Sequence, residues 1–83
     1  MSDDEFDLLD ELYFLQSYDH LKNETGWDDH KLLSTLRQLF QKEYIKCYSA
    51  PDQEVFEGAD LDRDGFRYYY LATKKGLLKH NAL

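Results

Sequence analysis

The stretch DDHKLLSTLRQLFQKEYIKCY, residues 28–48, carries the clearest pattern in the chain. Its first part has apolar residues spaced as on one face of a helix, namely Leu32, Leu33, Leu36, Leu39 and Phe40. Its second part, from Tyr44 to Tyr48, alternates roughly and is rich in β-branched and aromatic residues, which is typical of a strand. No glycine or proline interrupts the run, so we expect a long amphipathic helix joined to a strand by a very short turn.

The size and composition of the chain predict one small folded domain. The chain has 83 residues, and seven Tyr, five Phe and one Trp make it rich in aromatic side chains. Such a composition favours a folded protein over a disordered one, but the core will be small. We therefore expect a single domain over residues 1–83.

Several features predict a cytoplasmic protein without a membrane contact. The chain begins Met-Ser-Asp-Asp-Glu, which is unlike a secretory signal. None of its apolar runs approaches the roughly 20 residues of a membrane-spanning helix. The single Cys47 has no partner for an internal disulfide, so we expect a small buried side chain in a reducing compartment.

The charge of the chain is unevenly distributed around a net value of −7. Residues 1–16 hold six acids and no base, and residues 49–67 hold six acids and two bases. Residues 17–48 are balanced, and residues 68–83 carry three lysines and no acid. This distribution does not match the positive face of a strong DNA-binding protein.

Two further helices are expected before residue 28. Leu8, Leu9, Leu12 and Leu15 predict a first helix over residues 4–16, and Ser17 is a suitable N-cap for a second helix over residues 17–24. Gly26 can adopt the left-handed conformation that ends this helix, and Asp28 or Thr25 can cap the next one. Two helices joined by a short turn with glycine are typical of a helix-turn-helix.

The second half of the chain predicts a long loop between two antiparallel strands. Residues 66–71 are aromatic and strand-like, and they should pair with residues 45–48 across an acidic loop, here called the wing. Within the wing, residues 53–59 are expected to form either a helical turn or an additional strand. Thr73 should cap a C-terminal helix over residues 73–80, with Leu77 and Leu78 as its anchors and fraying ends.

This order of elements resembles the winged helix-turn-helix domains of transcriptional regulators. The segment from Tyr70 to Leu77, Tyr-Leu-Ala-Thr-Lys-Lys-Gly-Leu, resembles the Tyr-Leu-Thr-x-x-Gly ending of PadR- and MarR-type domains. Ala72 is an additional residue in that pattern, and Lys22 stands where a small residue is usual. The resemblance implies an α+β fold with three helices, a two- or three-stranded antiparallel wing and a short C-terminal helix.

The same resemblance implies that the third helix enters the DNA major groove. The exposed residues that it would present are Asp29, His30, Lys31, Ser34, Thr35, Arg37, Gln38 and Gln41. Arg37 could bond to guanine, and Gln38 or Gln41 to adenine. Asp28 and Asp29 lie at the end of the helix that would approach phosphates, however, and the wing is acidic, so a solvent-exposed helix face is the simpler interpretation.

A calcium site and an enzyme are less favoured by the sequence. Residues 60–65, Asp-Leu-Asp-Arg-Asp-Gly, match the first half of an EF-hand loop, but position twelve is Leu71 where a bidentate Glu should stand. The residues are more simply an acidic turn at the wing tip. No spacing of histidines and Cys47 indicates a metal ligand set, and no catalytic motif indicates an enzyme or a cofactor.

The expected function is therefore a winged-helix module that binds a protein partner or forms a homodimer. Because strand side chains alternate, either Tyr68 and Tyr70 or Tyr69 and Leu71 point away from the core. Exposed tyrosines beside an acidic loop would suit a protein interface, and we take Tyr68 and Tyr70 as candidate contacts. DNA binding through the helix after residue 28 is the alternative function.

Overall fold

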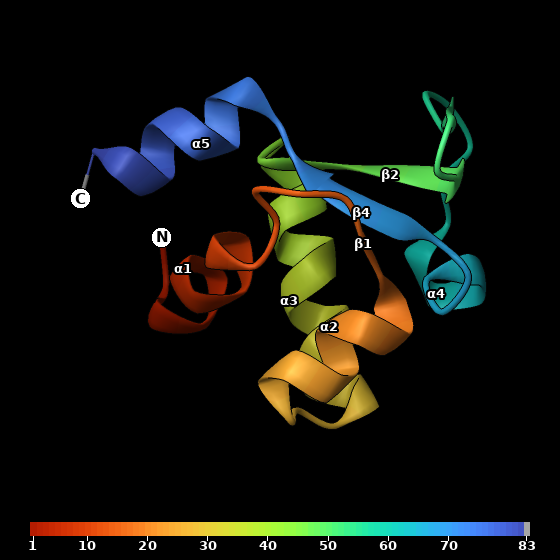
Figure 1. Ribbon diagram of the computed structural model, residues 1–83, viewed down its shortest axis with the longest axis horizontal. Coiled ribbons are helices and arrows are strands. Elements are labelled where there is room, and N and C mark those ends of the chain that lie inside the picture. Colours follow the sequence, from red (N-terminus) through yellow and green to blue (C-terminus); the bar gives the residue numbers. More distant parts are fainter. Residues whose placement is uncertain (83) are drawn as a thin grey trace.

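The computed structural model describes residues 1–82 and is an α+β fold, as the sequence predicts, with Leu83 outside the described part. Figure 1 shows α1, α2 and α3 gathered below the strands, with α5 beside one end of the sheet. The elements in order are α1 (Asp3–Asp10), β1 (Gln16–Ser17), α2 (Tyr18–Thr25), α3 (Asp29–Gln41), β2 (Ile45–Ala50), β3 (Gln53–Glu54), α4 (Leu61–Asp64), β4 (Tyr69–Ala72) and α5 (Lys74–Asn81).

The described strands form one antiparallel sheet in the order β1-β4-β2-β3. Its centre is the β2–β4 pair, in which Ile45 stands opposite Ala72 and Tyr48 opposite Tyr69. The sequence predicts two or three strands, and the structure has four in the described residues. The two edge strands have two residues each, which is too short to produce an alternating pattern.

The prediction of a first helix over residues 4–16 is wrong in its second half, because α1 ends at Asp10. The carbonyl of Leu12 accepts a hydrogen bond from the Ala72 amide at 2.8 Å, so the chain has already turned toward β4. This turn brings Gln16 opposite Tyr70 in the sheet. Leu12 continues the apolar spacing of α1 and is fully buried, but it lies in the turn after the helix has ended.

The predicted caps of α2 and α3 are confirmed. The Ser17 hydroxyl accepts a hydrogen bond from the His20 amide at 3.1 Å, and Gly26 ends α2 with a φ of 68°. Of the two candidate caps for α3, Asp28 is the one in use, since its carboxylate accepts from the Lys31 amide at 2.8 Å. These caps satisfy amides that a helix start leaves without partners and fix the short connection between the two helices.

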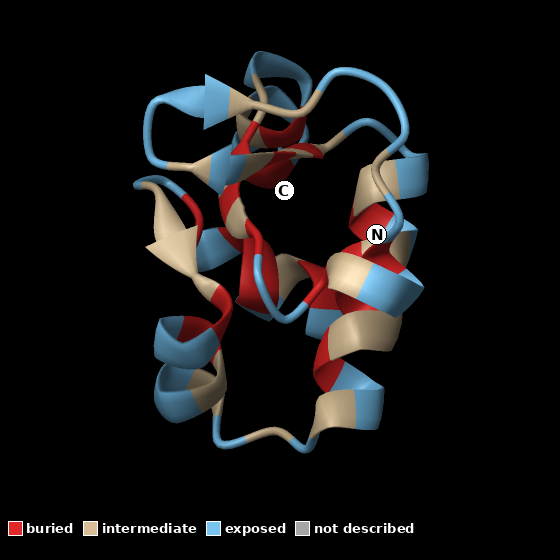
Figure 2. Cartoon of the chain, turned by 90° about the vertical axis from the view of Figure 1, so that its right-hand side faces the viewer, coloured by how far each residue is buried: buried red, intermediate tan, exposed pale blue. Residues whose placement is uncertain are grey.

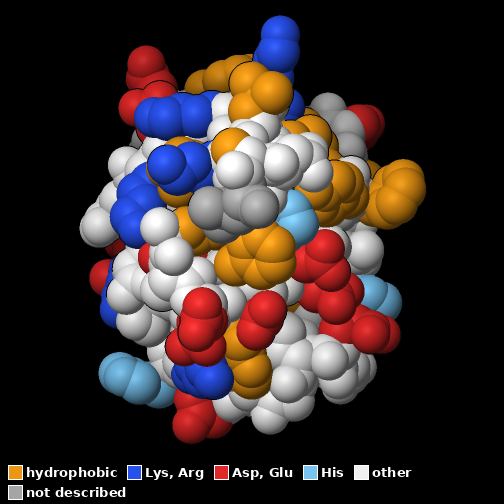
Figure 3. All heavy atoms as spheres, turned by 90° about the vertical axis from the view of Figure 1, so that its left-hand side faces the viewer, with side chains coloured by type: hydrophobic (Ala, Val, Ile, Leu, Met, Phe, Trp, Pro, Cys, Tyr) orange, Lys and Arg blue, Asp and Glu red, His pale blue; other side chains and the backbone are white. Residues whose placement is uncertain are grey.

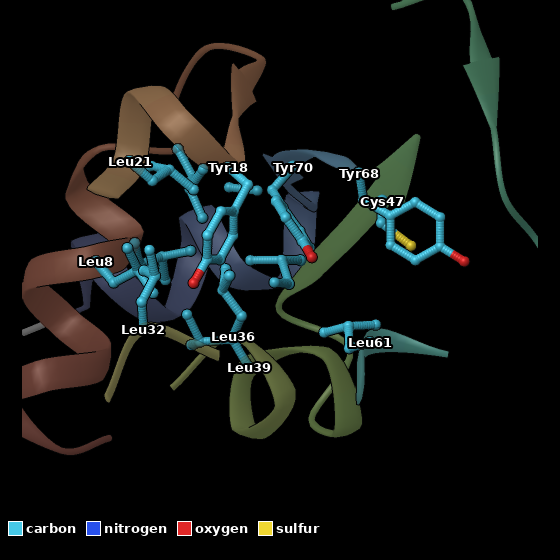
Figure 4. Packing of buried hydrophobic residues seen from close by; sticks show 14 residues of the cluster. Leu8, Tyr18, Leu21, Leu32, Leu36, Leu39, Cys47, Leu61, Tyr68 and Tyr70 are labelled. Atoms are coloured by element: carbon cyan, nitrogen blue, oxygen red, sulfur yellow. The ribbon is translucent and has the colours of Figure 1, made fainter. Parts of the chain in front are cut away.

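The core lies between α1, α2, α3 and the inner face of the sheet. Leu32, Leu36 and Leu39 of α3 are fully buried, as the apolar spacing predicts. Figure 2 shows that the buried residues of the helices and strands face inward, and Figure 4 shows the rings of Tyr18 and Tyr70 among the leucines. Cys47 is fully buried, as expected, and burial raises the pKa of its thiol to about 11.

The wing region differs from the prediction in its details. The second long strand, β4, begins at Tyr69 rather than at residue 66, because Phe66 and Arg67 belong to the turn after α4. In the segment over residues 53–59, the additional strand is observed and no helical turn. The helical turn of the wing is α4, which starts after Asp60.

The C-terminal helix α5 is capped by Thr73 as predicted, and the predicted anchor Leu77 is partly buried against the core, but the prediction of Leu78 as an anchor is wrong. Leu78 is 62% exposed, whereas His80 is buried. The His80 ring stacks on Phe6 with a centroid separation of 4.1 Å, and its Nδ1 lies 2.6 Å from the Tyr13 hydroxyl. Gly76 packs against the backbone of Tyr44. The contacts of Gly76 and His80 thus hold α5 against Tyr44, just before β2, and against α1.

The ion pair between Glu5 and Lys42 fixes α1 to the end of α3. Glu5 is buried, and the Lys42 ammonium donates to its two carboxylate oxygens at 3.0 and 2.8 Å. Burial raises the pKa of Glu5, but hydrogen bonds from Lys42 and Ser2 outweigh it, so the net pKa lies below the ordinary 4.5. Ser2 and Glu5 also form a capping box at the start of α1.

We expect Glu5→Gln to lower the free energy of unfolding at neutral pH by about 1 kcal/mol, because Lys42 is nearly half exposed. Since the folded-state pKa is depressed, this stabilisation is complete above 4.5 and is lost as the pH falls through the lower folded value. Urea unfolding of both proteins at about pH 7 and pH 3 should show a difference that shrinks in acid. Asp7→Asn on the same helix is the control, and a pH-independent difference would contradict the ion-pair assignment.

Candidate interaction surfaces

The polar residues predicted as contacts on α3 do not form one continuous free surface. Gln38 and Gln41 are exposed, and Ser34 is half-buried. Thr35 is buried, and its hydroxyl donates to the Lys31 carbonyl at 2.8 Å. The prediction of Thr35 as a contact residue is therefore wrong, because it lies on the edge of the apolar face rather than on the solvent face.

The cations of the α3 face are already paired with acids of the same chain. Lys31 Nζ lies 3.5 Å from a carboxylate oxygen of Asp4 and 4.3 Å from the centre of the Trp27 ring. The Arg37 guanidinium donates to the carboxylate of Asp62 in α4. Both cations that a DNA-reading helix would direct at phosphates or bases are thus partly neutralised within the fold.

The start of α3 is acidic and well ordered by side-chain contacts. The Asp29 carboxylate accepts from the Tyr18 hydroxyl at 2.7 Å and from Lys22 Nζ at 2.9 Å. These two hydrogen bonds lower the pKa of Asp29, while burial beside the same carboxylate raises the pKa of Tyr18. Asp29 is thus paired with Lys22, and the exposed carboxylate of Asp28 is the negative charge at this helix end that disfavours a phosphate backbone.

Tyr68 and Tyr70 face the core rather than the outer surface where partner contacts were predicted. Tyr70 is fully buried and its hydroxyl donates to the Gly65 carbonyl at 2.8 Å, so burial raises its pKa strongly. Tyr68 is also buried, and its ring meets that of Tyr70 edge to face. The prediction of Tyr68 and Tyr70 as partner contacts is wrong, and Tyr69 and Leu71 occupy the outer positions.

The residues that resemble half of an EF-hand loop have other partners. Asp60 caps α4 by accepting from the Arg63 amide at 3.1 Å, Asp62 bonds to Arg37, and Asp64 bonds to the Arg63 guanidinium. Asp60 and Asp64 therefore bond within the helical turn, and Asp62 joins that turn to α3. Across residues 1–82, no three side chains of His, Cys, Asp or Glu gather into a possible metal site.

A basic surface that the sequence analysis did not select lies on α5. Lys74, Lys75 and Lys79 surround a hollow of about 640 Å³ whose apolar lining is Tyr44, Leu78 and Ala82. We call this hollow the α5 groove. The three lysines between residues 68 and 83, in a segment without acids, were the available signal. These lysines alone do not indicate a groove, because the sequence does not show that α5 contacts Tyr44.

In comparisons with known proteins, no family model, curated protein or solved structure matches the chain. In the described part of the chain, every helix is too short or too polar to span a bilayer.

Proposed function

We propose that the chain is a small winged-helix domain. The order of elements supports this, because a short strand β1 follows the first helix and pairs with the last strand beyond the wing. The connection between α2 and α3, with Gly26 in the left-handed region, suits a helix-turn-helix. The long wing between β2 and β4 adds a two-residue strand and one helical turn.

We propose further that this domain binds a protein partner and acts without catalysis, as a module of the transcriptional-regulator type. The observation that carries the proposal is the pairing of Lys31 with Asp4 and of Arg37 with Asp62. These pairs leave α3 with little free positive charge, and the wing beside it is acidic. Since phosphate contacts dominate DNA affinity, such a helix is better suited to a protein surface.

Binding of DNA through α3 is the second candidate function, and Gln38 and Gln41 favour it. Both are exposed on the helix that a winged-helix regulator inserts into the major groove, and both can bond to adenine. A homodimer is a second form of the protein-binding proposal. The buried, free Cys47 suits a reducing compartment, so we place the activity in the cytoplasm.

A salt-dependent binding assay separates the two functions. We expect fluorescence anisotropy with labelled duplex DNA to show weak binding at about 50 mM salt that disappears near about 150 mM. Arg37→Ala should change this weak binding no more than Arg67→Ala, a control that removes an exposed cation outside α3. Sedimentation of the unliganded protein tests the homodimer in the same buffers.

One result of the same assay would favour DNA binding over protein binding. Tight, sequence-selective binding of duplex DNA near about 150 mM salt that is lost in Arg37→Ala and kept in Arg67→Ala would replace the protein-binding proposal by the DNA-binding regulator.

A further inference from the structure

The positive charge of the protein is available mainly on α5. Most cations outside this helix lie within 4.0 Å of a carboxylate, in pairs such as Lys42–Glu5 and Lys46–Glu54. Within residues 1–82, none of the lysines of α5 lies that close to a carboxylate, and Arg67 is the other lysine or arginine of which this is true. Among residues 1–82 of a chain of net charge −7, three lysines on one helix thus have no carboxylate within 4.0 Å.

The α5 groove combines these lysines with exposed apolar surface. Leu78 is 62% exposed, and Lys75 Nζ lies 5.7 Å from the centre of the Tyr44 ring, which lines the same hollow. A neighbouring hollow of about 570 Å³ shares Lys74 and Lys75 and continues toward Phe56, which is 83% exposed. The two hollows together form an extended path from the end of β3 to the end of α5.

The groove is held in place by backbone contacts on its inner side. The Thr73 amide donates to the Tyr44 carbonyl at 2.9 Å, and the Thr73 hydroxyl donates to the Glu43 carbonyl at 2.7 Å. The same hydroxyl accepts from the Gly76 amide at 3.0 Å. These bonds fix the first turn of α5 to the beginning of β2, so the lysines project from a pre-organised surface.

We propose that the α5 groove binds an acidic, amphipathic peptide segment of a partner protein. This inference rests on the proposed protein-binding function and names the surface and the chemistry of the partner. Apolar side chains of the segment would occupy the hollow between Tyr44 and Leu78, and its carboxylates would face Lys74, Lys75 and Lys79. The second hollow contains Glu43 and Glu54, so the acidic groups of the segment belong at the α5 end.

The distribution of charge favours a peptide over a membrane or a nucleic acid. Figure 3 shows basic and apolar side chains together in its upper part, and many acidic side chains lower on the same face. A flat anionic membrane or a long phosphate backbone would meet both regions and be repelled by the acidic one. A short peptide in the groove meets mainly the lysines, because charges about 8–10 Å away are strongly screened at physiological salt.

Fluorescence anisotropy with a short fluorescein-labelled peptide of glutamate and leucine pairs tests the proposal. We expect saturable binding that falls at least about tenfold in the double variant Lys75→Gln/Lys79→Gln, which removes two positive charges, and also in Leu78→Ser. The control is Arg67→Glu, which changes the net charge by the same amount at an exposed cation in the turn between α4 and β4 and should bind normally. A peptide with glutamine in place of glutamate should bind much more weakly. Circular dichroism checks that each variant is folded.

The outcomes distinguish this proposal from the one on which it rests. If the α5 variants bind the peptide as tightly as the unchanged protein does, the peptide does not bind in the α5 groove. The further inference is then wrong, and the proposed protein-binding function is unaffected. An equal loss of peptide affinity in Arg67→Glu would mean that only the net charge of the protein matters, which would overturn the proposal. Failure of the peptide to bind, or tighter binding to vesicles of phosphatidylserine and phosphatidylcholine or to duplex DNA, would overturn it as well.

Discussion

Replacing Leu36 by alanine is expected to lower the free energy of unfolding by about 2–5 kcal/mol. Leu36 is fully buried at the middle of α3, between the fully buried Leu32 and Leu39. Truncation removes apolar contacts and leaves a cavity that the surrounding helices and sheet can fill only in part. In an 83-residue chain, a loss of this size is a large share of the total stability.

Thermal unfolding followed by circular dichroism measures this effect. For a domain of this size, each kcal/mol corresponds to about 4–8 °C in Tm, so the expected decrease is well above experimental error. Gln38→Ala is the control on the same helix, because Gln38 is exposed and alanine has the higher helix propensity. An equally small change in both variants would mean that α3 is rotated or absent.

Replacing Gly76 by alanine is expected to destabilise the protein by about 1–3 kcal/mol. A Cβ at this position would lie 2.1 Å from the Tyr44 carbonyl oxygen and 2.9 Å from its carbon. Both are backbone atoms, so α5 must move away from the beginning of β2 to make room. That movement also disturbs the hydrogen bonds of Thr73 to Glu43 and Tyr44.

Whether Gly76→Ala raises or lowers the stability tests the packing of α5 against Tyr44. At an open helix position, the same substitution stabilises a protein, because alanine is the better helix former by about 1 kcal/mol. Lys79→Ala in the same helix is the control and should leave the midpoint of urea unfolding nearly unchanged. An increase in stability for Gly76→Ala would show that α5 does not pack against Tyr44.

Elements with strong local signals could be predicted from the sequence. The apolar spacing from Leu32 to Leu39 defines α3, and Ser17, Gly26 and Thr73 occupy the cap positions that they favour chemically. The burial of Cys47 also followed from its place in a strand. These features depend on neighbours within a few residues, which the linear sequence displays directly.

Features that depend on distant residues could not be predicted. The two residues of β1 become a strand only because β4 lies beside them, and the orientation of Tyr68 and Tyr70 depends on which face of β4 meets the core. Alternation places successive side chains of a strand on opposite faces of the sheet, but it does not show which face is buried. The pairing of Arg37 with Asp62 and the α5 groove arise in the same way, from elements joined only by tertiary packing.

The contact between Tyr13 and His80 joins residues that are 67 positions apart. With Phe6 stacked on the His80 ring, it makes the beginning and the end of the described chain into one packing unit. Such contacts raise the contact order, which is the mean sequence separation of contacting residues, and each one forms only after a long loop has closed. We therefore expect the contact between α1 and α5 to form later in folding than the local turns of either helix.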